Sequence, residues 1–94
     1  MEPLSVSKDP EQIRKEIKKA VGEFKRTRIA AESEFYLHFT FRSAVFRFID
    51  DVEFEIDPDQ QVLHFRSASR LGYSDLGVNR KRMEKLTRRL RGRI

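Results

Sequence analysis

Residues 35–42 constrain the fold most, because their apolar and polar side chains alternate strictly. The apolar members are Phe35, Leu37, Phe39 and Phe41, and the members between them are Tyr36, His38, Thr40 and Arg42. Successive side chains of a β-strand point to opposite faces, so a period of two predicts a strand with one buried and one wet face. Residues 51–57 repeat the pattern around Val52, Phe54 and Ile56. We therefore expect a sheet that covers a core on one side only.

Two helices and two further strands are expected around these segments. Asp9 and Pro10 supply an N-cap and a first helical residue, and an apolar stripe follows at helical spacing: Ile13, Ile17, Ala20, Val21 and Phe24. Residues 27–31 and 61–71 are the other strands, with a turn at 57–60 before the last one. A second helix begins after Ser74 or Asp75, and its buried stripe holds Met83, Leu86, Leu90 and, by spacing, Asn79.

This order predicts an α+β domain in which a four-stranded antiparallel meander carries both helices on one face (α-β-β-β-β-α). Ninety-four residues are enough for a single domain, 1–94. Within it, residues 1–8 are expected to be an irregular lead-in, and residues 80–94 a basic C-terminal helix and tail. The aromatic stretch 44–49 breaks the alternation and is expected to turn the chain.

Positive charge is concentrated in that C-terminal segment. Residues 80–94 hold eight basic side chains and one acid, a charge of +7, whereas the rest of the chain carries −2. Such a helix is suited to nucleic acid phosphates or an anionic surface through Arg80, Lys81, Arg82, Lys85, Arg88 and Arg89. Cations at a helix C-terminus also simply oppose the helix dipole. Most of the aromatics lie on the predicted core face and none interleaves with this basic surface, so the sequence does not indicate a base-stacking platform. With no Cys and two His, we expect no metal site and no cofactor.

The last two expected strands bring acids and arginines onto one sheet face. Strand parity places Asp51 and Glu53 with Arg66 and Arg70, and predicts that Arg66 lies within ion-pairing reach of Asp51 or Glu53. One interpretation is a solvated face of weak cross-strand pairs. The other is a ligand site where these four residues and Tyr73 bind a partner and the arginine forks hold an anion.

Ser67 and Ser69 point by parity towards the apolar face, where their hydroxyls need partners. We interpret them as a structural polar lock with Asn79 and Asp75, in which Asn79 is buried and binds the segment 67–75. A nucleophilic serine is disfavoured, because no His or Lys is placed in sequence to activate it. The carboxylates also suit general acid catalysis poorly, since neighbouring arginines keep them ionised. Catalysis is therefore uncertain and the less favoured hypothesis.

Two stretches, FRFIDDVEF at 46–54 and RSASRLGYSDLGVNRKR at 66–82, resemble domain-of-unknown-function family 1499 (DUF1499). The resemblance runs from about Pro3 to the end of the second helix and implies a fold rather than a mechanism. It also implies that relatives carry a Cys-containing leader, in some cases after an export or lipoprotein signal, and that plant relatives are plastid proteins. No such leader or transmembrane segment is present here, so a cytoplasmic location is expected. Our leading hypothesis is a non-catalytic binding or protein-interaction module with an unknown partner. A nucleic-acid or anionic-surface binder and an uncharacterised enzyme are the alternatives.

Overall fold

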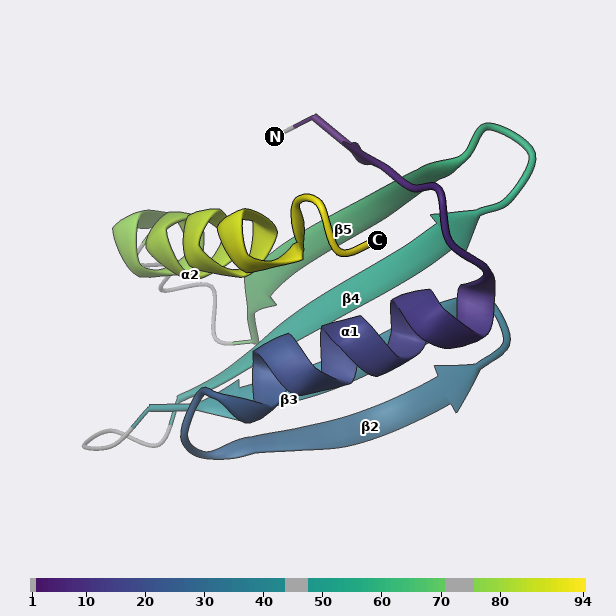
Figure 1. Ribbon diagram of the computed structural model, residues 1–94. Helices are drawn as coiled ribbons and strands as arrows, with labels where there is room; N and C mark the ends of the chain where they lie inside the picture. The colour runs from purple at the N-terminus through teal and green to yellow at the C-terminus, as the bar shows by residue number, and fades with distance from the viewer. Residues whose placement is uncertain (1, 44–47, 71–75) are drawn as a thin grey trace.

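The computed structural model describes residues 2–43, 48–70 and 76–94. It confirms the α+β class: one antiparallel sheet carries two helices, which lie on the same face (Figure 1). The sheet contains five strands in the order β1-β5-β4-β3-β2. Their bounds are β1 Leu4–Ser5, β2 Thr27–Ser33, β3 Tyr36–Arg42, β4 Ile49–Asp57 and β5 Val62–Ser69.

The sequence predicted four strands and an irregular segment over residues 1–8, but a fifth strand lies within that segment. Leu4 and Ser5 form β1, which pairs antiparallel with Leu63 and Val62 of β5. Two residues are too few to show an alternation, so the sequence does not predict this strand. It forms by pairing with the edge of β5. Leu4 and the following Val6 are buried in the core, which explains why this segment is held against the sheet.

The helices bury the stripes that their spacing predicts. Helix α1 (Pro10–Gly22) begins at Asp9, whose carboxylate accepts the Gln12 N–H at 2.9 Å. Its four apolar stripe residues from Ile13 to Val21 are buried, and Phe24 packs against the core. Helix α2 (Leu76–Leu90) buries Met83, Leu86 and Leu90. The proposed caps Ser74 and Asp75 lie outside the described residues, and so do residues 44–47 of the stretch expected to turn the chain.

The sheet therefore has a covered face and an open face. Leu37, Phe39 and Phe41 of β3 and Val52, Phe54 and Ile56 of β4 are buried beneath the helices. Among the described residues, no element lies over the opposite face (Figure 1). No helix in this part of the chain has the length and apolar character needed to cross a membrane.

Candidate functional site

The open face carries two parallel rows of hydrogen-bonded side chains across β3, β4 and β5. In the first row, the Tyr36 hydroxyl donates to Glu53 Oε1 at 2.6 Å, and Arg66 donates to Glu53 Oε2 through Nε at 3.0 Å and Nη2 at 2.5 Å. The contact expected between Arg66 and Glu53 is thus present. It follows from the register, because Glu53 stands directly opposite Arg66 in the β4–β5 ladder.

The second row repeats this arrangement two residues along β4. His38 Nε2 lies 2.8 Å from Asp51 Oδ1, and Arg70 binds the same carboxylate through Nε and Nη2 at 2.9 and 3.0 Å. Each row thus joins an aromatic ring of β3, a carboxylate of β4 and an arginine, which is Arg66 of β5 in the first row and Arg70, directly after β5, in the second. Tyr73, the remaining residue of the predicted ligand site, lies outside the described residues.

These contacts shift the protonation equilibria of the rows. The hydrogen bonds from Arg70 lower the pKa of the Asp51 carboxyl, and those from Tyr36 and then Arg66 lower the pKa of Glu53. Because it donates to the Glu53 carboxylate, the Tyr36 hydroxyl has its pKa raised to about 12. At neutral pH both carboxylates are therefore ionised and already bound, so neither is suited to act as a general acid.

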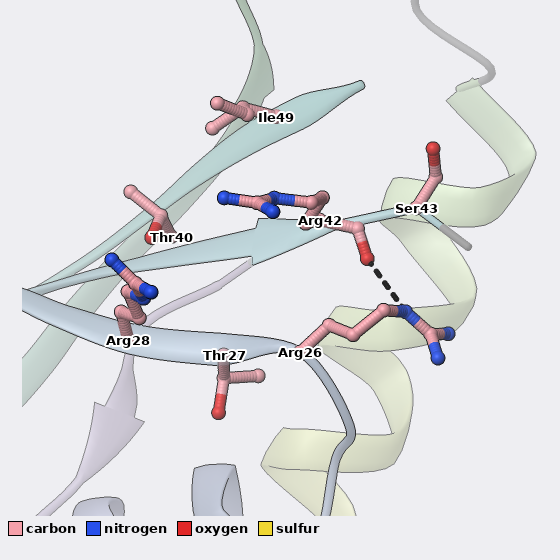
Figure 2. A pocket seen from close by; sticks show the side chains of 7 residues that line it. All are labelled: Arg26, Thr27, Arg28, Thr40, Arg42, Ser43 and Ile49. Carbon is pink, nitrogen blue, oxygen red and sulfur yellow. Dashed lines mark hydrogen bonds between the residues drawn. The ribbon is translucent and has the colours of Figure 1, made fainter. Parts of the chain in front are cut away.

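A hollow of about 370 Å³ adjoins these rows where β2 begins and β3 ends, and we call it the arginine hollow. It is lined by Arg26, Thr27, Arg28, Thr40, Arg42, Ser43 and Ile49. Figure 2 shows the side chains of Arg28, Thr40 and Arg42 on one side of the sheet and that of Thr27 on the other. Thr40 stands opposite Arg28 on one side and Asp51 on the other, so the hollow continues the open face that bears the rows.

Backbone and side-chain hydrogen bonds hold Arg26 and Arg42 together at the rim of the hollow. The Arg42 N–H donates to the Arg26 carbonyl at 3.0 Å, and Arg26 Nε donates to the Arg42 carbonyl at 3.1 Å (Figure 2). Arg26 adopts a left-handed backbone conformation with a φ of 58°, which is unusual for a residue with a side chain. Arg26, the residue before β2, is thus held in a strained backbone conformation beside the hollow.

The arginine hollow differs from the rows in charge. In the part of the chain that the structure describes, no acidic residue lines it. Within the described residues, none of its three arginines forms an ion pair, whereas Arg66 and Arg70 each bind a carboxylate. The nearest acid in the register, Asp51, is already shared by Arg70 and His38. Sequence reasoning missed this group, although parity within β3 places Thr40 and Arg42 on the same face as Tyr36 and His38.

A second polar cluster lies under α2. Asn79 is 8% exposed, accepts a short hydrogen bond from the Ser67 hydroxyl through Oδ1, and donates from Nδ2 to Ser69 Oγ at 3.2 Å. The expected burial of Asn79 and its contact with the last strand are therefore present; Asp75, the fourth member of the predicted lock, lies outside the described residues. Arg82 also joins this cluster, donating to Asn79 Oδ1 at 3.1 Å and pairing with Asp50 at 2.9 Å.

The basic residues of α2 that were expected to bind nucleic acid phosphates or an anionic surface do not form one uniform exposed surface. Arg82 is largely buried, with its guanidinium 4.7 Å from the Phe41 ring centroid. Arg89 pairs with Glu23 and lies over the Phe24 ring, as does Lys85. Arg80 is exposed and pairs with Glu84. In the described part of the chain, the exposed Lys81 and Arg88 have no such ion pair.

A further hollow of about 370 Å³ lies between β1 and α2, but its lining is balanced in charge, with Glu2 and Glu84 beside Arg88 and Arg91. A search of the described residues for His, Cys, Asp and Glu side chains finds no group of three placed to hold a metal ion. The arginine hollow is therefore the stronger candidate for an anion site.

Residues 1–90 match the profile of a family described as Protein of unknown function (DUF1499). The chain belongs to this family. Comparison with curated proteins gave no match, and comparison with solved structures gave none. In this DUF1499 chain, the two stretches that carry the resemblance contain the acids and arginines of both rows and five members of the cluster under α2: Asp50, Ser67, Ser69, Asn79 and Arg82. The arginine hollow lies almost wholly outside them.

Proposed function

We propose that the protein is a non-catalytic binding module that takes an anionic group of its partner in the arginine hollow. The observation that carries the proposal is the composition of the hollow, where Arg28, Arg42 and Thr40 share one side of the sheet and no acid is found among the lining residues that the structure describes. Guanidinium groups present planar donor forks that match carboxylate and phosphate oxygens, and hydroxyls add further donors.

The neighbouring rows support this proposal because their charges cancel, which leaves the net positive charge of the open face at the end where the hollow lies. Asp51 and Glu53 are bound by Arg70 and Arg66, so the middle of the open face is close to neutral. The positive charge of Arg28 and Arg42 is not offset in this way. The rows also join β3, β4 and the residues of and just after β5 through side chains, and Thr40 of the hollow stands next to one of them, opposite Asp51.

The proposal is tested by titrating the isotope-labelled protein with inorganic phosphate at low ionic strength and following backbone amide shifts. We expect saturable shifts at Arg28, Thr40, Arg42 and Ser43. Arg28→Gln and Arg42→Gln should each weaken binding by about three- to tenfold, because each removes one charge-assisted donor set at a solvated site. The matched control is Arg88→Gln, an exposed arginine on α2, which should bind as the parent does. Phosphate affinity that is unchanged in both hollow variants would overturn the proposal.

A weak binder of nucleic acid or an anionic surface is the second candidate, because Lys81 and Arg88 are exposed on α2 without an ion pair in the described residues. Such binding would be electrostatic, with an affinity that falls steeply as salt rises. A fluorescent single-stranded oligonucleotide distinguishes the two. If Arg88→Gln loses oligonucleotide binding and Arg28→Gln keeps it, the oligonucleotide binds on α2. If Arg28→Gln loses binding and Arg88→Gln keeps it, the oligonucleotide binds in the hollow.

A further inference from the structure

Strand β2 is an edge of the sheet, and its first half offers unpaired backbone groups beside the arginine hollow. Among the described residues it pairs with β3 alone, and its register continues from Thr27 to Ile29 before a bulge at residue 30. The Arg42 N–H donates to the Arg26 carbonyl, so the polar backbone groups of Arg26 and Arg28 face β3. Those of Thr27 and Ile29 consequently point away from the sheet.

The side chains of this edge differ between its two faces. Arg28 lies on the open face opposite Thr40 and lines the hollow. Ile29 stands opposite the buried Phe39 and so lies on the helix-bearing face, yet it is 51% exposed, the largest exposed fraction of any bulky apolar residue described. The edge therefore presents a cation on one face and an apolar side chain on the other.

We propose that the partner is an extended segment of another protein that adds to β2 as an antiparallel or parallel strand. Its residues alternate between acidic and apolar, with an acid opposite Arg28 in the hollow and an apolar residue against Ile29. Strand addition supplies main-chain hydrogen bonds for affinity and alternate side chains for specificity. This inference rests on the proposed anion site and names the kind of partner that the site takes.

A second copy of the chain fits this edge poorly. Antiparallel pairing centred on Arg28 sets two arginines against one another, and like charges directly opposite are destabilising. The register that would bring Glu32 opposite Arg28 centres on residue 30, where the bulge interrupts the ladder. Charge and register thus favour an acidic segment of a different protein.

The experiment uses three capped peptides of glutamate and valine. The first alternates the two residues, the second has the same composition in two blocks, and the third alternates them but carries N-methyl groups on the backbone amides of one edge. We expect the alternating peptide to bind about tenfold more tightly than the other two, since only it makes both sets of contacts. On its binding, hydrogen exchange of the Thr27 and Ile29 amides should slow. Ile29→Ser and Arg28→Gln should each weaken the binding of the alternating peptide. Circular dichroism checks that both protein variants are folded.

The outcomes separate the inference from the proposed function. Equal affinity for the alternating and block peptides would overturn strand addition while leaving the anion site in place. No binding of any acidic peptide, together with no phosphate shifts, would overturn both. A concentration-dependent dimer of the protein alone, abolished by Ile29→Ser, would overturn the assignment to a different protein.

Discussion

At the scale of single residues, Asn79 occupies a position that helical spacing assigns to the core. Its amide joins α2 to Ser67 and Ser69 of β5, and its removal takes away the hydrogen bonds that both hydroxyls make to it and one of those made by Arg82. We predict that Asn79→Leu and Asn79→Ala each lower the free energy of unfolding by about 1–3 kcal/mol. Thermal unfolding measures the loss, which corresponds to a Tm lowered by at least several degrees. Thr87→Val is a control on the same helix, because within residues 2–43, 48–70 and 76–94 the buried Thr87 hydroxyl bonds the Glu84 carbonyl alone. A Tm equal to that of the parent in both Asn79 variants would exclude a structural role.

Residue-level prediction from the sequence succeeded where parity alone decides a contact. Alternation along two adjacent strands was enough to place Arg66 beside Glu53 and Ser67 beneath the helix, because a strand offers only two faces. The arginine hollow was not found in this way. Most of its residues come from the start of β2 and the end of β3, and their proximity depends on the β2–β3 register. No charged pair or tight-turn motif in the sequence predicts that register.

At the scale of elements, the pair Asp50–Arg82 connects β4 to α2. Both side chains are 13% exposed, so removing one partner leaves a largely buried charge. We predict that Arg82→Met lowers the free energy of unfolding by about 3–5 kcal/mol, and that adding Asp50→Leu restores much of the loss. Urea unfolding of the two single variants and the double variant measures this coupling. Arg80→Met is the surface control, since the exposed Arg80–Glu84 pair should contribute less than about 1 kcal/mol. Strictly additive losses in the double variant would refute the coupling.

Elements with strong periodicity were also predicted better than short ones. The alternation of β3 and β4 and the capped stripe of α1 reappear almost unchanged, because each pattern spans enough residues to define a buried face. Strand β2 continues to Ser33, beyond the predicted Ala31, because β3 supplies partners as far as Tyr36. Strand β1 has no pattern of its own and depends on β5, a long-range partner that local sequence does not reveal.

At the scale of the whole molecule, the rows make stability depend on pH in both directions. The pKa values of Asp51 and Glu53 are lowered on folding, so their contribution is complete above the ordinary carboxyl pKa of about 4 and is lost as the pH falls through the lower folded values. The Tyr36 pKa is raised to about 12, so its contribution is complete below the ordinary tyrosine pKa of about 10 and is lost as the pH rises through the folded value.

We therefore predict that Glu53→Gln flattens both the acid and the alkaline limbs of the stability profile. The variant lacks the titrating carboxyl and also the negative charge that raises the Tyr36 pKa. Urea unfolding across the pH range provides the measurement, and absorbance titration reports the tyrosine pKa directly. Glu55→Gln is the matched control on the same strand and face, because the Glu55 carboxylate belongs to neither row. Alkaline limbs of equal slope in Glu53→Gln and in the parent would contradict the prediction.

The pairing of β1 with β5 has a consequence for the order of folding. Strands β2 to β5 pair with their neighbours along the chain, whereas Leu4 meets Leu63 only after almost the entire meander exists. Closing so long a loop costs more chain entropy than forming the hairpins, so β1 should dock after the rate-limiting step. Leu4→Ala would then accelerate unfolding and leave the refolding rate nearly unchanged, as stopped-flow measurements in urea can establish. A ribosome-bound chain would accordingly keep its first strand unpaired until β5 has emerged.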